Sequence, residues 1–256
     1  MARMLTFSLQ SGSNGNAIYV EAGATRLLFD AGISGAQAQQ RMQRHGRNVR
    51  DVDALIISHD HIDHVRCMGV YQRKFNIPIY ITQPTYRALP MDPGRLKDLR
   101  FFRAGDPLTF GAVTVRTIPT PHDAKDGVAF VVEFEGRRLG ILTDLGHAFD
   151  GLAELLATLD AAYLECNYDP HMLETGPYPW PVKQRIKGPG GHLSNDDSAV
   201  LLKRCGCRLP RWIAVSHLSE ENNVPQLAID VQRSAVGQFY PVHWASRYDV
   251  SEVFEV

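Results

Sequence analysis

The sequence Ser58-His59-Asp60-His61-Ile62-Asp63-His64 combines three histidines and two aspartates within seven residues. It stands where a short apolar strand ends and a helix begins, and layered α/β proteins usually place their sites at the carboxyl ends of strands. His59 and His61 can face one ion together, while Asp63 and His64 on the first helical turn can face a second. Such ligands suit zinc or manganese. The alternative is a polar loop with ordinary histidines, but no structural role requires these residues so close together.

Further candidate ligands stand where other apolar stretches end. His122, Asp144 and His217 each occur at or just after the end of such a stretch, so all three are expected at the same rim. Asp144 has two carboxylate oxygens and could bridge two cations. Asp30 also ends a strand and is placed to orient a ligand histidine by accepting its hydrogen bond. Two more polar residues complete the set, Glu165 and His192, and the remaining histidines are expected to be structural: His45, His147, His171 and His243.

The hydrophobic pattern predicts strands and helices that alternate in two similar halves. Strands are expected at 5–9, 17–21, 26–30, 54–58, 77–82, 113–118, 128–134, 138–143, 161–166 and 212–216, followed by a terminal strand pair. Helices are expected at 37–45, 65–75, 151–159, near 195 and at 224–234, with a proline- and glycine-rich connection at 169–191. This order predicts two sheets face to face with helices outside, an αββα sandwich that forms one domain over residues 1–256.

The composition is that of a globular protein in a reducing compartment. The chain has 44% hydrophobic and 21% charged residues, and no stretch approaches the roughly 20 apolar residues of a membrane helix. The start of the chain lacks the long apolar run of a signal peptide. Four scattered cysteines show no disulfide or zinc-knuckle spacing. We therefore expect a cytoplasmic protein that does not bind membranes.

The net charge of −1 argues against a chain that coats nucleic acid by charge alone. A local basic segment is nevertheless present, because the residues between Asp30 and Asp51 include no acid but four arginines: Arg41, Arg44, Arg47 and Arg50. Such a segment is typical either of a solvated helix surface or of a local contact for phosphate groups.

The ordered set of candidate ligands resembles the metal motifs of the metallo-β-lactamase superfamily over essentially the whole chain. The matching residues are His59-x-His61-x-Asp63-His64, His122, Asp144 and His217. Asp30, within Leu28-Phe-Asp-Ala-Gly32, is similar to the early aspartate motif of that superfamily. The pair Asp63-His64 resembles the hydrolase version of the site, since true β-lactamases usually lack the second residue of the pair. The resemblance implies a metal-dependent hydrolase with the αββα fold.

Three segments resemble one branch of the superfamily, the YycJ/WalJ group of single-strand 5′-to-3′ DNA exonucleases: 11–16, 191–195 and 217–223. The last two are also similar to the transfer-RNA 3′-processing endonucleases (tRNase Z), in which a histidine paired with a glutamate protonates the leaving group. By that likeness His192 is the general acid and Glu165 is its orienting partner. No long insertion in this chain resembles the flexible arm with which tRNase Z holds transfer RNA.

The expected cofactors are two divalent metal ions, Zn²⁺ or Mn²⁺. Cations about 3.5–4 Å apart can share a hydroxide and neutralise charge on a phosphoryl group under attack. In this hypothesis the bridging hydroxide attacks phosphorus and His192 protonates the departing sugar oxygen, so His192, Glu165 and Asp63 are the catalytic candidates. One ion is expected on His59, His61 and His122, and the other on Asp63, His64 and His217, with Asp144 between them.

Substrate contacts are expected in loops near the catalytic histidine. Residues 178–187 interleave aromatic side chains with cations, as in sites that stack the bases and pair the phosphates of a single strand. Lys183 and Arg185 are the candidates for phosphate contact, although the aromatic residues could equally pack under a proline-rich loop. Further hydrogen-bonding candidates stand in loops rich in glycine or serine: Asn14, Asn16, Ser194, Asn195 and Asn222. The predicted partner is single-stranded nucleic acid.

Other functions are compatible with parts of this pattern. The substrate could be a small cyclic phosphodiester, as for the related enzymes of phosphonate metabolism, or a transfer RNA or other RNA. Relatives that hydrolyse thioesters or lactones lack a segment like that at 191–195. A member that had lost its metals and served as a binding module would not be expected to keep the complete ligand set. The sequence leaves open the native metal, the direction of attack and the formation of a homodimer.

Overall fold

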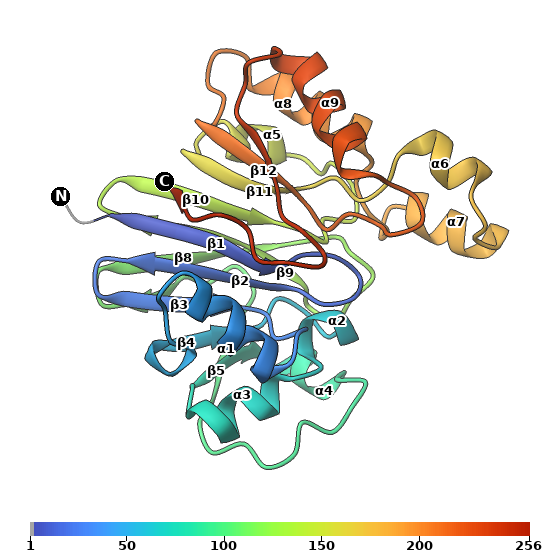
Figure 1. Cartoon of the computed structure of the whole chain (residues 1–256). Helices are drawn as coiled ribbons and strands as arrows, with labels where there is room; N and C mark the ends of the chain where they lie inside the picture. Colours follow the sequence, from blue (N-terminus) through green and yellow to red (C-terminus); the bar gives the residue numbers. More distant parts are fainter. Residues whose placement is uncertain (1–2) are drawn as a thin grey trace.

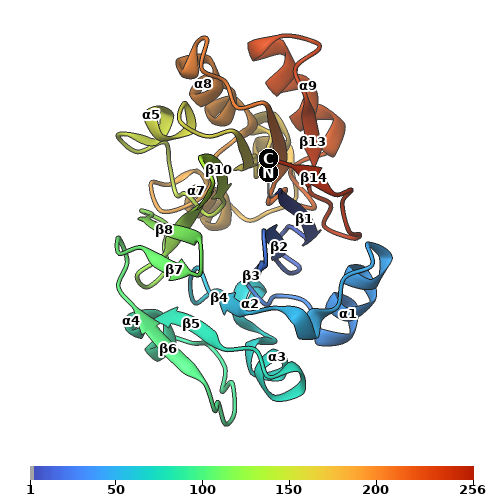
Figure 2. The same ribbon diagram turned by 90° about the vertical axis from the view of Figure 1, so that its left-hand side faces the viewer.

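The computed structural model describes residues 3–256, which form two seven-stranded sheets packed face to face (Figure 1 and Figure 2). The first sheet has the order β14-β1-β2-β3-β4-β5-β6, with β1 (Met4–Gln10), β2 (Ala17–Ala22), β3 (Thr25–Phe29), β4 (Ala54–Ile56), β5 (Ile79–Thr82), β6 (Leu99–Phe102) and β14 (Phe254–Glu255). The second has the order β13-β12-β11-β10-β9-β8-β7, with β7 (Leu108–Phe110), β8 (Val113–Pro119), β9 (Val128–Phe134), β10 (Arg137–Leu142), β11 (Ala161–Glu165), β12 (Trp212–Ser216) and β13 (Val242–Trp244).

Helices cover the outer face of each sheet (Figure 1). The first sheet carries α1 (Gly35–Arg44), the short helix η1 (Val49–Asp51), α2 (Ile62–Val65), α3 (Met68–Phe75) and α4 (Gln83–Arg87). The second carries α5 (Leu152–Leu156), α8 (Asn195–Cys205) and α9 (Pro225–Val236), whereas α6 (Pro170–Thr175) and α7 (Trp180–Lys187) lie beyond the sheet (Figure 1). The predicted αββα sandwich is therefore confirmed.

Successive side chains of each strand point to opposite faces of the sheet and so build three hydrophobic layers. In β3, Leu27 and Phe29 face the space between the sheets, whereas Leu28 faces the helices outside. Phe29 meets Phe130 of β9 across that space, with ring centroids 5.0 Å apart. Because both faces of each central strand are covered, these strands are apolar along most of their length. This packing fixes the positions of the strand ends.

Six strands end at the same edge of the sandwich. Strands β3, β4 and β5 are parallel neighbours in the first sheet, and β10, β11 and β12 are parallel neighbours in the second. Parallel strands have their carboxyl ends at one edge, so the residues that follow them are gathered there. The amide of Val128 donates to the carbonyl of Ser58 over 3.1 Å, which links the two sheets at this edge.

Three predicted elements differ in the structure. The helix expected at 65–75 is divided into α2 and α3, because the amide of Cys67 donates to the carbonyl of Ala31. The connection expected at 169–191 contains α6 and α7, each with proline in its first turn, where the missing amide proton costs nothing. The terminal strands are not a pair, since β13 joins β12 and β14 joins β1.

Within residues 3–256, no helix has the length and the apolar character needed to traverse a lipid bilayer. The four cysteines are free thiols.

Candidate metal centre

Three residues at this edge have a left-handed backbone that side chains rarely adopt. The φ angles are 64° at Asp30, 55° at Asp144 and 55° at His217. Such a conformation costs of order 1–3 kcal/mol and persists only where the surroundings enforce it. The amide of Asp30 is held by the carbonyl of Ile56, and that of His217 by the hydroxyl of Ser11. Strain of this kind is typical of functional sites.

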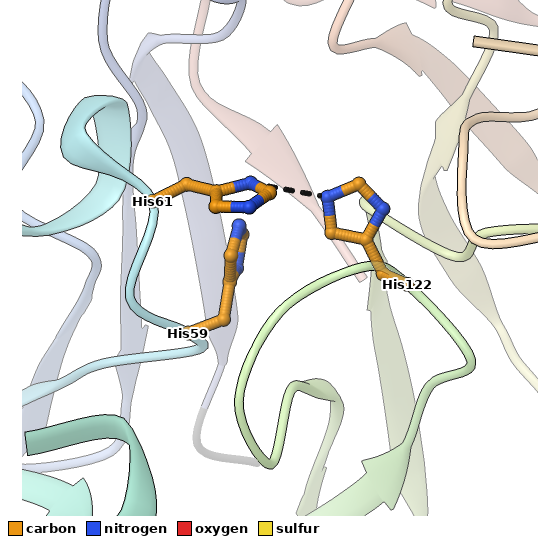
Figure 3. Close-up of side chains that lie close together, drawn as sticks. All are labelled: His59, His61 and His122. Carbon is orange, nitrogen blue, oxygen red and sulfur yellow. Dashed lines mark hydrogen bonds between the residues drawn. The ribbon is translucent and has the colours of Figure 1, made fainter. Parts of the chain in front are cut away.

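The first group of converging ligands consists of His59, His61 and His122. Their rings point toward one another from two different segments (Figure 3), and the candidate ligand atoms lie within 4.8 Å of one another. His122 Nε2 is 3.2 Å from His61 Nδ1, while His122 Nδ1 is held by the carbonyl of Gly191 at 2.8 Å. His59 Nε2 is buried and has no hydrogen-bond partner among the described residues. A buried polar atom without a partner is costly, so this nitrogen fits a metal ion.

The second group consists of Asp63, His64 and His217. Asp63 Oδ2 is 3.3 Å from His64 Nε2 and 3.4 Å from His217 Nε2. His64 and His217 are almost completely buried, whereas Asp63 is partly exposed. One carboxylate and two imidazoles at this spacing form a second set of ligands of the kind that divalent zinc prefers.

Asp144 stands between the two groups. Its Oδ1 lies 3.6 Å from His122 Nε2 and 3.5 Å from His217 Nε2. Its Oδ2 lies 3.3 Å from His64 Nε2 and has no hydrogen-bond partner among the residues described. A carboxylate that reaches ring nitrogens of both groups fits the role of a bridge. The arrangement is the buried histidine and aspartate cluster typical of dinuclear metal sites in this fold.

Two neutral residues hold these candidate ligands in place, although the sequence did not single them out as ligands or as supports for ligands. The hydroxyl of Ser58 donates to Asp30, and Asp30 Oδ2 in turn accepts a hydrogen bond from His64 Nδ1 at 2.8 Å. The amide of Asn16 donates to Asp63 Oδ2 over 3.0 Å. Hydrogen bonds of this kind orient ligand side chains and tune the metal that they bind. Asp30 thus lies behind His64, and its role in orienting a metal ligand stays a prediction.

Gly32 allows the loop after β3 to approach α2 closely. A Cβ atom at this position would lie 1.6 Å from the carbonyl oxygen of Asp63, a separation that no side chain tolerates. The amide of Gly32 donates to the carbonyl of Asn16 over 2.9 Å. The glycine therefore allows three segments that carry or support ligands to meet.

Burial and neighbouring charges shift the pKa values in the cluster. Burial lowers the pKa of the His59 imidazole well below its ordinary value, and the nearby His64 lowers it further. Burial opposes ionisation of Asp144, but His217 and His64 outweigh burial and bring the pKa of that carboxyl below its ordinary range. Burial also disfavours charge on His64, yet Asp63 and Asp144 hold the pKa of that imidazole well above its ordinary value. The carboxylates are thus ionised at neutral pH, which is the form that binds cations.

A further pair, His192 and Glu165, lies beside the bridge position. His192 Nδ1 is 2.7 Å from Glu165 Oε1 and 3.7 Å from Asp144 Oδ1. Glu165 is fully buried, and its Oε2 accepts the amide proton of Leu145 over 2.9 Å. The side chain of His192 is 19% exposed, so one part of the ring reaches solvent while the other is fixed by the glutamate. This arrangement can hold and release a proton.

A hollow of about 410 Å³ opens over the cluster and is lined by His61, Asp63, Asp144, His192 and His217. Arg185 of α7 also lines this hollow. Its Nε is 2.5 Å from Asp123 Oδ2, and Asp123 Oδ1 lies 3.7 Å from ring nitrogens of His61 and His122. Asp123 was not singled out from the sequence, although it directly follows His122.

The other proposed substrate contacts bond to the protein itself. The amide of Asn14 donates to the carbonyl of Arg247, and Lys183 Nζ donates to the carbonyl of Glu174. The remaining three are buried: Ser194 caps α8, Asn195 pairs with Asn223, and Asn222 bonds to Ser219. Arg185 is the one residue of this set that lines the hollow over the cluster.

The remaining histidines lie outside the cluster. His45 Nε2 bonds to the carbonyl of Ser251, and His147 Nδ1 bonds to the carbonyl of Pro189. His243 packs against Phe254, and His171 is exposed on α6.

Comparison with known proteins agrees with this geometry. The profile of the metallo-β-lactamase superfamily matches residues 11–188. The chain belongs to this superfamily. The family membership predicted from the ligand motifs is thereby confirmed, and the protein is a metal-dependent hydrolase of the metallo-β-lactamase fold.

Two relatives and one solved structure show how far the similarity extends. The chain is 33% identical to exodeoxyribonuclease YycJ of Bacillus anthracis, over 97% of this chain and 92% of the relative. It is 34% identical to exodeoxyribonuclease WalJ of Streptococcus pneumoniae serotype 2 strain D39, over 86% of this chain and 83% of the relative. The crystal structure of the metallo-β-lactamase fold protein YhfI from Bacillus subtilis superposes with a TM-score of 0.75 at 17% identity, over 99% and 100% of the two chains, which shows the shared fold.

Proposed function

We propose that this superfamily member is a phosphodiesterase that removes nucleotides from the 5′ end of single-stranded DNA. The observation that carries the proposal is the His192–Glu165 pair, held 2.7 Å apart beside a double cluster of metal-ligand side chains. When water attacks the phosphorus of a phosphodiester, the bond to the sugar oxygen breaks and that oxygen leaves as an alkoxide. The alkoxide requires a proton, and an imidazole is the usual donor. The exodeoxyribonuclease names of two relatives with about a third of their residues identical support DNA as the polymer.

The ligands divide between two metal positions in this proposal. The first position is held by His59, His61 and His122, the second by Asp63, His64 and His217, and Asp144 contacts both. Two divalent ions bound there would activate water and neutralise charge on the phosphoryl group. Zn²⁺ and Mn²⁺ both suit imidazole and carboxylate ligands.

The residues of the chain supply orientation and proton transfer. Asp30 accepts a hydrogen bond from Nδ1 of His64. Nε2 of the same ring therefore faces Asp63 and Asp144. Glu165 accepts a hydrogen bond from His192 Nδ1 and so fixes the orientation of the imidazole. The second ring nitrogen, Nε2, then gives its proton to the departing 3′ oxygen of the terminal nucleotide.

Helix α7 provides a surface for the rest of the strand. None of its residues is buried, and the side chain of Trp180 is 71% exposed, so this tryptophan is not packed under the preceding loop. Arg185 on the same helix lines the hollow over the metal cluster. Bases stack on exposed aromatic rings without regard to sequence, and an arginine fork pairs with phosphate, which here would replace the Asp123 carboxylate that Arg185 holds. We therefore assign substrate contact to Trp180 and Arg185.

The test of this function is digestion of end-labelled polymers by the metal-loaded protein. We expect stepwise release of mononucleotides from the 5′ end of single-stranded DNA, and slower or no release from duplex DNA and from RNA. A ladder of internal cuts or a preference for RNA would contradict the exonuclease and favour an RNA-processing enzyme. Hydrolysis of cyclic phosphodiesters without any cleavage of polymers would favour a small-molecule phosphodiesterase.

Two further properties belong to the same proposal. The four free thiols are compatible with a reducing cytoplasm, where we place the protein. The formation of a homodimer stays a prediction, which the molar mass of the purified protein in light scattering tests.

A further inference from the structure

A second hollow, of about 440 Å³, borders the same loop 11–16 as the hollow over the metal cluster. Ser13 of this loop lines the hollow over the cluster, while the next residue, Asn14, lines the second hollow. Three arginines contribute to its wall, and we call it the arginine cavity after them: Arg41, Arg66 and Arg247. Arg66 directly follows α2, the helix that carries Asp63 and His64.

The charge in the arginine cavity is poorly balanced. None of the residues that line it is acidic. Arg41 bonds to the carbonyls of Leu9 and Tyr248 and to the side-chain oxygen of Gln10, all of which are neutral. Arg66 bonds only to the carbonyls of residues 14 and 32. Among the described residues, Arg247 alone of the three has a carboxylate partner, Glu220 at 3.0 Å.

One of the arginines that line the cavity has a buried polar atom without a partner in the described part of the chain. Arg247 Nε is buried without a hydrogen-bond partner among residues 3–256, in a side chain that is 8% exposed. Arg41 is similarly buried, at 9%. A guanidinium keeps its charge at neutral pH even when burial disfavours it, so Arg41, whose hydrogen-bond partners are all neutral, calls for an anion. The first turn of α1 contributes Ser34 and Gln37 to the same wall, and helix starts favour negative groups.

We infer that the arginine cavity binds a phosphate group. The planar forks of arginine match phosphate oxygens, and the volume accommodates a nucleotide phosphate with part of its sugar. The inference rests on the proposed function only for the molecule that supplies this phosphate group. On a single strand, the phosphate belongs to a nucleotide some way along from the bond over the metal cluster, with the strand passing over the loop 11–16. A free phosphate compound is the other source of the same chemistry.

This inference also resolves the arginine-rich segment between Asp30 and Asp51. Arg44 forms an ion pair with Asp249 and Arg47 with Glu21, so these two are neutralised at the surface. Arg41, on the same helix, faces the cavity without such a partner. Arg50 lies over the ring of Phe75, 5.5 Å from its centroid. The segment thus contributes Arg41 to the cavity and does not form a continuous basic face.

The substitution Gln37→Glu tests the cavity without dismantling it. Gln37 Oε1 accepts the amide proton of Ser34, and the hydroxyl of Ser34 accepts that of Gln37. Glutamate makes the same reciprocal bonds at the start of a helix, so the variant should fold and melt at the same or a higher temperature. Its carboxylate, however, competes with phosphate for the three guanidinium groups. The matched control is Gln43→Glu, which adds the same charge to an exposed position of α1 outside the cavity.

Two measurements on the metal-loaded variants give the answer. The first is the affinity for a short phosphorothioate single strand as a function of salt concentration. We expect Gln37→Glu to bind the strand about tenfold more weakly than Gln43→Glu. The slope of log affinity against log salt concentration should be smaller by about 0.7 for each lost phosphate contact. The second is the rise in melting temperature on addition of inorganic phosphate, which the Gln37→Glu variant should lose in part or entirely.

The outcomes separate the inference from the proposed function. A difference between the variants in strand affinity supports a strand phosphate, and a difference confined to inorganic phosphate supports a free phosphate compound. Equal behaviour of the two variants in both measurements overturns the cavity as a phosphate site, even if the protein digests DNA as proposed. If no polymer is cleaved, the inorganic phosphate measurement still decides. Ser34→Asp, which keeps a good helix cap and adds charge to the same wall, must reproduce the Gln37→Glu result.

Discussion

Replacement of Asp144 by asparagine is expected to remove both metal ions and reduce hydrolysis to the background rate. Asp144 oxygens lie 3.3–3.6 Å from ring nitrogens of His64, His122 and His217, which belong to both metal positions. The neutral amide has one weak ligand oxygen and an NH₂ group that repels cations. Loss of a supporting side chain costs about 10–100-fold in metal affinity, and a shared ligand should cost more. Metal content per chain and the rate of strand hydrolysis measure the effect.

Two comparison variants calibrate that experiment. Asp30→Asn removes the acceptor behind His64 but no direct ligand, so its metal loss should be smaller than that of Asp144→Asn. Asp150→Asn alters an exposed carboxylate away from the cluster and should leave metal content unchanged. An Asp144→Asn protein that retains two ions and normal turnover would show that this residue does not bridge the metal positions.

His192→Ala should lower the rate of strand hydrolysis by about 10²–10⁴-fold while both metal ions stay bound. The imidazole is held by Glu165 at 2.7 Å and lines the hollow above the cluster, where a departing oxygen would be. The loss should be much smaller for a p-nitrophenyl phosphodiester, because p-nitrophenolate leaves without a proton. The ratio of the rates for the strand and for the p-nitrophenyl ester, together with the metal content of the variant, distinguishes the loss of a proton donor from the loss of a metal ligand.

The position of His192 also allows a different role, that of a metal ligand. Ligand atoms of Asp144, Glu165, His192 and His217 lie close enough together to hold an ion. Loss of metal from the His192→Ala protein, with equal damage to both substrates, would make this histidine a ligand. His171→Ala removes an exposed histidine of α6 and serves as the unchanged reference.

The strand pattern and the cluster at 59–64 were sufficient to predict the layers of the fold. Alternation in strands such as β8 and apolar runs such as β9 and β11 leave little choice of element. The division between α2 and α3 could not be predicted, because it depends on a tertiary hydrogen bond from Cys67 to Ala31. The last strands looked like a pair because they are neighbours in sequence, yet each completes the edge of a different sheet.

The candidate site shows a similar division. Residues with strong chemical character, such as His122 and Asp144, could be assigned because each follows a recognisable strand. Neutral residues such as Asn16 and Ser58 have no such signal, since the same residue types occur in any turn. Asn195 illustrates the converse, because its loop-like context conceals a buried side chain paired with Asn223.

Anomalous X-ray scattering from crystals of the metal-loaded protein tests the dinuclear centre most directly. We predict two peaks about 3.5–4 Å apart, one bounded by His59, His61 and His122 and the other by Asp63, His64 and His217, with the carboxylate of Asp144 reaching both. A single peak, or peaks away from these side chains, would contradict the two-metal hydrolase.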